Sequence, residues 1–201
     1  MELFKSLLTR ARLYIQVTHI SDIARRYFVK NGMDGSMTVL GIILGAWTAK
    51  VEQPNIIVMA GLGACLAMGV SGLFGAYLTE KAERRRQLRT LEQSMLSDLE
   101  DSLHQDASEF VPAFAAVVDG LSPALTAVIS LIPFMLSIVG LLPIWDSYMI
   151  SVVLTFITLF ALGLYLGQVA KERMWLYGLQ MLAAGVIIAI IVFFLGGLEP
   201  V

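Results

Sequence analysis

Cysteine and histidine, two common metal ligands, are nearly missing from this sequence, which has one cysteine and two histidines. A single cysteine excludes a disulfide within the chain and a zinc cluster of thiolates. Cys65 lies in an apolar run, where a free thiol acts as a small packing residue. The sequence also lacks a paired His/Glu metal motif, a Ser/His arrangement and a glycine-rich phosphate loop, so it predicts neither an enzyme nor a bound cofactor.

Charged residues are also scarce, at 15% of the chain, whereas soluble domains carry about 25%. Hydrophobic residues make up 57% of the 201 positions, and the mean hydropathy is +0.76. These values predict an integral membrane protein. A membrane span needs about 20 apolar residues, so the chain has room for five or six spans. No short apolar core precedes a small-residue cleavage site at the N-terminus, so a cleaved signal peptide is not expected.

The apolar runs predict an all-α integral membrane protein with five transmembrane helices. The runs cover residues 34–49, 55–78, 111–142, 148–169 and 176–198. Pro123 and Pro133 are expected to kink or break the third span. Glycines four residues apart let membrane helices approach closely, and they occur at Gly41/Gly45 and at Gly163/Gly167.

Two segments are hydrophilic enough to lie outside the bilayer. Residues 1–30 have an apolar stripe and a basic face, which predicts an amphipathic helix in the headgroup layer that prefers anionic lipid. Residues 79–108 predict a helical amphipathic linker, basic in its first half and acidic in its second. The chain is therefore divided into residues 1–30, spans 1 and 2 (31–78), the linker (79–108) and spans 3 to 5 (109–201). His19 and Asp22 are interpreted as interfacial polar residues.

The basic residues predict an orientation. With five spans, all but one of the 14 lysine and arginine residues fall on one side of the membrane, and Lys50 is the exception. Because positive residues mark the cytoplasmic side, the N-terminus and the linker are expected inside and the C-terminus outside a multi-pass cell membrane protein.

Two acids stand at the starts of apolar runs, each followed by glycine: Asp34-Gly35 and Asp119-Gly120. Under the predicted orientation both lie near the same membrane face. They are expected to form a carboxylate pair, within one subunit or across a dimer axis, that holds a divalent cation or shares a proton. The alternative is that the two acids are independent and each lies at a helix start, where Asp34 would cap the helix.

Other candidate ligands lie near these acids. Met33, Met37 and Met68 offer thioether sulfur, which beside a carboxylate suits Fe²⁺ or another transition ion better than Mg²⁺, although methionines in apolar proteins mostly serve packing. Glu80 and Glu83 in the linker are candidates for collecting cations, and the alternative is a solvated helix face. His104 is a lone histidine and is weak evidence for a metal site.

Several stretches in order resemble the vacuolar iron transporter family. They are the Met33-Asp34-Gly35 start, the run from Ser71-Gly72 to Glu83, Ile132-Pro133-Phe134, Gly163-Leu164-Tyr165 and residues 175–185. The resemblance implies a homodimeric transporter with metal ligands on the first two spans. This sequence has Gly72 where the family has methionine and Ala64 where better-studied members have glutamate. Its insert between spans 2 and 3 is also shorter than the family's metal-collecting domain.

The resemblance implies export of a divalent transition-metal ion, Fe²⁺ or Mn²⁺, from the cytoplasm in exchange for protons. The expected metal and proton path consists of Asp34, Asp119, Met37, Met33 and Met68. The alternative is a membrane protein of the same fold that binds a lipid or a partner, or carries another solute, without transporting metal. Nucleic acid is not an expected partner.

Overall fold

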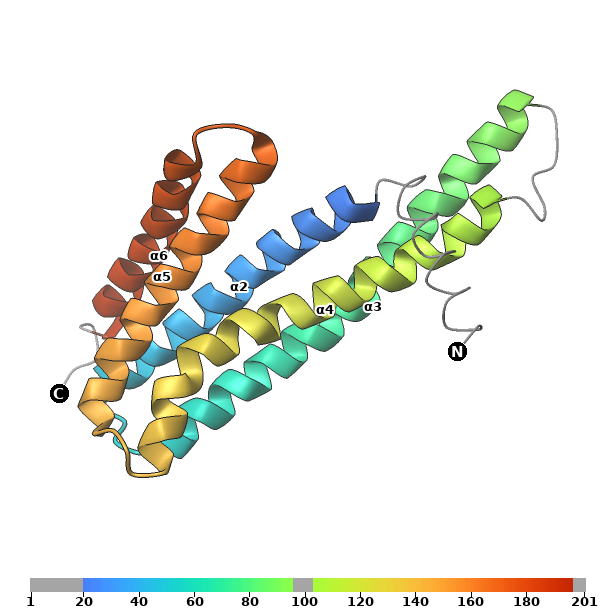
Figure 1. Ribbon diagram of the computed structural model, residues 1–201. Helices are drawn as coiled ribbons and strands as arrows, with labels where there is room; N and C mark the ends of the chain where they lie inside the picture. The colour runs from blue at the N-terminus through green and yellow to red at the C-terminus, as the bar shows by residue number, and fades with distance from the viewer. Residues whose placement is uncertain (1–19, 96–102, 197–201) are drawn as a thin grey trace, which may run out of the picture. The chain divides into compact units, whose positions relative to one another are not determined.

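The computed structural model describes residues 20–95 and 103–196, and every regular element in these ranges is an α-helix. The helices are α2 (Ile20–Thr48), α3 (Pro54–Met95), α4 (Leu103–Ile138), α5 (Ile144–Ala170) and α6 (Met174–Gly196) (Figure 1). The predicted all-α fold class is therefore confirmed. The predicted surface helix falls partly on residues 1–19, outside the described residues, and from Ile20 onward the chain runs within α2.

The number of spans is not confirmed by the structure. In the described part of the chain, four helices are long and apolar enough to cross a membrane: α3, α4 from Phe110, α5 and α6. The predicted first span lies inside α2, whose first half carries Lys30 and Asp34, so its apolar part is shorter than a bilayer needs. The third predicted span is not broken by Pro123 or Pro133, because α4 runs through both.

The chain forms two compact units, and α2, α3 and α4 each contribute to both. Unit 1 comprises Met1–Phe28 and Val70–Gly120, and unit 2 comprises Val29–Gly69 and Leu121–Val201.

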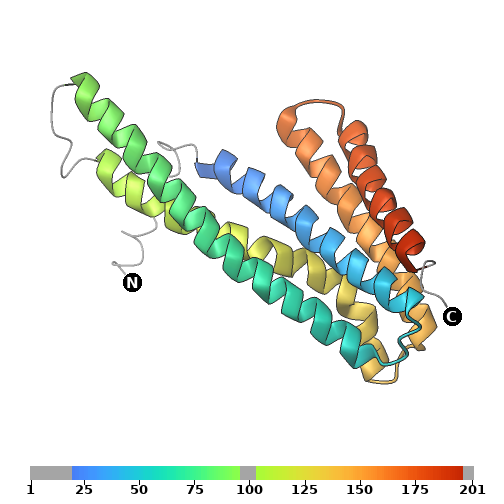
Figure 2. The ribbon, with the colours of Figure 1, turned by 180° about the vertical axis from the view of Figure 1, so that it is seen from behind.

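In unit 1, the C-terminal half of α3 and the first half of α4 run antiparallel and side by side (Figures 1 and 2). Residues 79–95 of the predicted linker continue α3 without a break, and residues 103–108 form the start of α4. Residues 96–102 of the predicted linker lie outside the described residues. The start of α2 packs against α4 through a small core of Ile23, Val111 and Ala115.

Unit 2 has the larger core, which joins α2, α3, α4 and α5. Its buried members are Val39, Ile43, Ile57, Val58, Cys65, Ala127, Leu131, Phe134 and Tyr148. The burial of Cys65 agrees with its predicted packing role. Helices α5 and α6 form a hairpin that approaches closely at its glycines. A Cβ built on Gly163 would lie 2.5 Å from the carbonyl oxygen of Tyr177, so the close packing predicted for this glycine pair is confirmed.

Buried hydroxyl groups form a ladder along α4 and α5 in unit 2. Each helix repeats a hydroxyl residue every fourth position, so the groups share one face: Ser122, Thr126 and Ser130 on α4, and Ser147, Ser151 and Thr155 on α5. Thr155 Oγ1 donates to Ser130 Oγ at 2.8 Å, which joins the two rows. Such bonds hold membrane helices together where lipid removes the hydrophobic driving force.

Candidate metal and proton site

Asp119 is the buried acid of unit 1, with only 5% of its surface exposed. It lies on α4 against Gly72 of α3. A Cβ built on Gly72 would stand 2.8 Å from Asp119 Oδ2 and 3.3 Å from the Asp119 carbonyl oxygen. The absence of a side chain at position 72 therefore provides the space in which the carboxylate lies. The position where the family has methionine is here covered by an acid from another helix.

The side-chain carboxylate and the backbone carbonyl of Asp119 both approach Gly72 on α3. The residue four positions later, Pro123, has no N–H and so cannot donate the usual helical hydrogen bond to the Asp119 carbonyl. A carboxylate and a backbone carbonyl together form a hard oxygen donor set, which suits Mn²⁺, Fe²⁺ or Mg²⁺ better than a soft ion. A buried carboxylate in an apolar bundle is costly, and a bound cation or a proton relieves that cost.

Tyr27 connects α2 to this part of unit 1. Its hydroxyl donates a hydrogen bond to Glu80 Oε1 at 3.1 Å. The pKa of Tyr27 is raised to about 12, first by burial and then by the negative charge of Glu80 and the hydrogen bond to it. The charge of Asp119 adds to the increase in the Tyr27 pKa. Tyr27, Glu80 and Asp119 therefore interact electrostatically, with Gly72 beside the most buried of them.

The two candidate glutamates of the linker have different surroundings. Glu80 is half-buried and holds the Tyr27 hydroxyl, whereas Glu83 is exposed. Glu83 accepts a hydrogen bond from Gln87 Nε2 at 3.0 Å, one helical turn further along α3. Glu80 is thus part of the polar cluster of unit 1, and Glu83 lies on the solvated face. The acidic residues from 96 to 109 lie outside the described side chains.

The remaining candidates belong to unit 2. Asp34 is exposed, and Met33 and Met37 are half-buried beside it on α2. The glycine after Asp34 is required by packing, because a Cβ on Gly35 would stand 2.6 Å from the Pro123 Cα. Met68 packs against the main core, and its sulfur accepts a hydrogen bond from Thr38 Oγ1 at 3.5 Å.

The predicted pair of Asp34 and Asp119 stays a prediction, since the two acids belong to different units. Within the described residues, no group of three or more His, Cys, Asp or Glu side chains is placed to hold a metal ion. A cation at Asp119 would therefore need water molecules or a second copy of the chain to complete its coordination.

Two features of this site are not contained in the sequence pattern. Tyr27 and Glu80 are separated by 53 positions, and no local motif links them. Gly72 has no chemistry of its own, and only the loss of the family's methionine marks its position. The spacing of Ser122, Thr126 and Ser130 was a readable signal for the hydroxyl ladder, since residues four apart share a helix face.

Comparisons with known proteins agree with the motifs quoted above. The VIT family model matches residues 25–104 and 90–197. An uncharacterized protein of Methanocaldococcus jannaschii is 29% identical over 171 residues, which cover 84% of this chain and 86% of that protein. The family match extends over nearly all of the described helices. The chain therefore belongs to the VIT family, the vacuolar iron transporters whose motifs its sequence resembles.

Proposed function

We propose that the protein exports a divalent transition-metal ion, Fe²⁺ or Mn²⁺, from the cytoplasm in exchange for protons. Membership of the VIT family supports metal-ion transport across a membrane as the general activity, carried out by a non-enzymatic protein. The single observation that carries the finer proposal is the Asp119 carboxylate, which is buried against the bare backbone of Gly72.

The chemistry of a buried carboxylate explains how one residue serves both ions. An ionised Asp119 in an apolar bundle is unfavourable, so it takes up a proton when no cation is bound and releases that proton when a cation arrives. Metal and proton thus compete for the same oxygen atoms, which makes their movements opposite in direction. Asp34 forms the exposed approach to the path, with Met33 and Met37 half-buried beside it. Glu80 and Glu83 attract cations at the linker end of the path.

The distribution of basic residues supports the direction of transport. Lysine and arginine concentrate before the apolar part of α2 and after the apolar part of α3, which favours a cytoplasmic N-terminus and linker and, with five spans, a C-terminus outside. The basic residues also favour contact with anionic lipid headgroups on that side.

A homodimer is part of the proposal. Gly41 and Gly45 on α2 and Gly63 on α3 have no atom within 4 Å of a built Cβ, so each position leaves room for a close-packed helix. A second copy would also supply the further ligands that a cation at Asp119 needs.

Flux into proteoliposomes tests the proposal. Purified protein is reconstituted with a pH gradient, and uptake of Fe²⁺, Mn²⁺ and Mg²⁺ is followed together with internal pH. The proposal expects Fe²⁺ or Mn²⁺ uptake with opposite proton movement, abolished in Asp119→Asn and reduced in Asp34→Asn. Asp146→Asn is the matched control, because Asp146 is an exposed acid in the first turn of α5.

Two results would count against the proposal. Unchanged flux in both Asp119→Asn and Asp34→Asn would exclude the carboxylates as the path. A wild-type protein that moves none of the three ions would favour the same fold without metal transport.

A further inference from the structure

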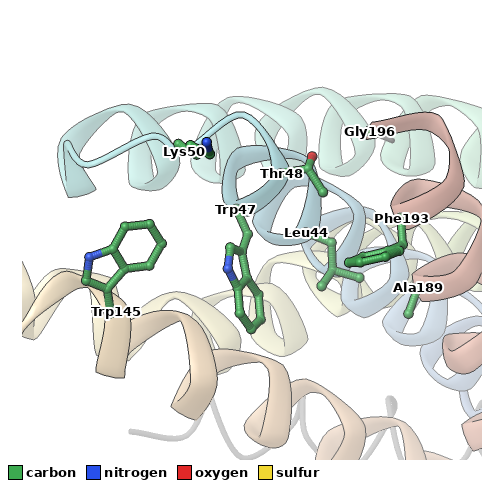
Figure 3. Close-up of a pocket in the computed structure, with 8 residues that line it drawn as sticks. All are labelled: Leu44, Trp47, Thr48, Lys50, Trp145, Ala189, Phe193 and Gly196. Carbon is green, nitrogen blue, oxygen red and sulfur yellow. The ribbon is translucent and has the colours of Figure 1, made fainter. Parts of the chain in front are cut away.

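A cavity of about 580 Å³ opens in unit 2 where α2 ends, α5 begins and α6 ends. Figure 3 shows its walls, which are formed by Leu44, Trp47, Thr48, Lys50, Trp145, Ala189, Phe193 and Gly196. The volume lies in the range of small-molecule sites, about 300–1,000 Å³. All eight residues belong to unit 2.

The chemistry of the walls combines a large apolar surface with a single charge. Five of the lining side chains are hydrocarbon or aromatic, and Lys50 is the one charged residue among the eight. The Thr48 hydroxyl donates to the Gly45 carbonyl at 2.9 Å, so its proton is already used within the helix. In Figure 3 the Trp47 and Trp145 rings stand side by side below Lys50.

The cavity lies at the end of the α5–α6 hairpin where α5 begins and α6 ends. Both helices are long and apolar enough to cross a membrane, and in that arrangement this end of the hairpin would meet the membrane–water boundary. Tryptophan is enriched at that boundary, and a lysine there reaches phosphate oxygens while its stem covers apolar surface. The cavity therefore meets acyl chains below and headgroups above.

The walls are held in place by contacts within unit 2. Tyr148 lies at 5.8 Å from the Trp47 ring and 5.7 Å from the Trp145 ring, centroid to centroid. The Tyr148 hydroxyl donates to the Val51 carbonyl at 2.8 Å, which fixes the turn after α2. Within that turn, Lys50 adopts a left-handed conformation with φ 54°, and its N–H donates to the Trp47 carbonyl. A rigid, preformed site loses less entropy when it binds.

We propose that this cavity binds an anionic phospholipid, with an acyl chain between Trp47, Trp145 and Phe193 and the phosphate on Lys50. The apolar walls exclude a polar solute, and the single positive charge selects a negative headgroup. Under the predicted five-span orientation, Lys50 is also the one basic residue that lies on the opposite side from all others. A bound anionic lipid accounts for a lysine on the side that otherwise has none.

The experiment measures lipid retained by the full-length protein. Protein purified in detergent is incubated with equal amounts of phosphatidylglycerol and phosphatidylcholine, and bound lipids are counted by native mass spectrometry. The wild type should retain phosphatidylglycerol about fivefold in preference, the effect of one lysine near a membrane surface. Lys50→Gln should abolish this preference. Lys171→Gln is the matched control, since Lys171 also ends a helix in a left-handed conformation, with φ 55°, but does not line the cavity.

A second variant separates the acyl chain from the headgroup. Ala189→Trp fills the cavity and should reduce retention of both lipids, whereas Ala183→Trp, on an exposed position of α6, should not. Equal retention of the two lipids by the wild type, or retention unaffected by both Lys50→Gln and Ala189→Trp, overturns the proposal. Loss of a dimer in Ala189→Trp with lipid retention unchanged would assign the cavity to a second copy of the chain, and would overturn it too.

Discussion

A side chain on Gly72 and the carboxylate of Asp119 compete for the same space, because a Cβ built on Gly72 would lie 2.8 Å from Asp119 Oδ2. Any substitution of this glycine must therefore move the acid or the helix that carries it. In a protein where the acid binds the transported ions, packing and transport are coupled at this one contact.

Gly72→Ala should lower both stability and flux. Overpacking a filled contact costs about 1–3 kcal/mol, and the displaced carboxylate no longer meets the ion. Gly75→Ala is the control, because a Cβ there meets no atom within 4 Å and alanine favours an exposed helix position over glycine by up to about 1 kcal/mol. Thermal unfolding and proteoliposome flux measure the two effects. Equal behaviour of the two variants would show that Asp119 does not depend on the space at Gly72.

The same contact predicts a rescue. In the double variant Gly72→Met with Asp119→Ala, the smaller residue on α4 makes room for the thioether that the family has on α3. Stability should recover relative to Gly72→Met alone, whereas flux should stay lost, because the double variant has no carboxylate at position 119. Stability and flux for Mn²⁺ and Fe²⁺ are compared among the three proteins. If the double variant is as unstable as Gly72→Met, the two positions do not compete.

Tyr27 predicts a loss of stability at alkaline pH. Its pKa in the folded protein is about 12, against a usual value of 10, so the folded state holds the phenolic proton more tightly than the unfolded state does. The stabilisation is complete below pH 10 and is lost as the pH rises toward 12. Tyr27→Phe removes this dependence and also the hydrogen bond to Glu80. Melting temperatures between pH 8 and pH 12 check the prediction, and identical pH profiles for Tyr27→Phe and wild type would contradict it.

Composition and periodicity were sufficient to predict the all-α membrane fold, the close approach at Gly163 and the packing role of Cys65. They did not predict that residues 79–95 would continue α3, because nothing in a charged, glycine-free helix marks where it leaves the bilayer. The first predicted span rests on an apolar run of 16 residues, 34–49, which is shorter than the about 20 apolar residues that a membrane span needs. Its helix begins well before Asp34, at Ile20, so its charged first half and apolar second half form one element.

The candidate site was only partly accessible to sequence reasoning. Asp119 was identified by its place at the start of an apolar run, and the structure adds that it is buried. The carboxylate lies in a space left by the absent side chain of Gly72 on α3. No local sequence pattern around Asp119 predicts this space. Tyr27 was missed for a related reason: a tyrosine among basic residues near a membrane surface resembles an ordinary interfacial aromatic, and only the tertiary contact with Glu80 distinguishes it.

Two buried hydroxyl groups of unit 2, those of Thr126 and Ser36, predict different effects for conservative substitutions. Thr126 Oγ1 donates to the Gly32 carbonyl at 2.8 Å, which links α4 to α2. Thr126→Val keeps the shape and removes this bond, and should cost about 0.6–2 kcal/mol. The buried Ser36 hydroxyl has no hydrogen-bond partner within the described part of the chain. Ser36→Ala should therefore be neutral or stabilising. Thermal unfolding compares them, and a larger loss in Ser36→Ala than in Thr126→Val would show that Ser36 is bonded to something outside the chain.

The surroundings of each membrane-helix glycine predict whether it serves packing within one chain or formation of the dimer. Gly163→Ala should disrupt the α5–α6 hairpin, because its Cβ would lie 2.5 Å from the Tyr177 carbonyl oxygen and 2.6 Å from Gly178 Cα, and backbone atoms do not yield as side chains do. Gly41→Ala faces open space in a single chain, so the stability of the monomer should not fall. Gly41→Ala should instead weaken the proposed dimer, because an added methyl group separates helices that pack through small residues. Unfolding temperature and oligomeric mass in detergent, measured for both variants, distinguish these effects. A dimer unaffected by Gly41→Ala would move the interface away from this face of α2.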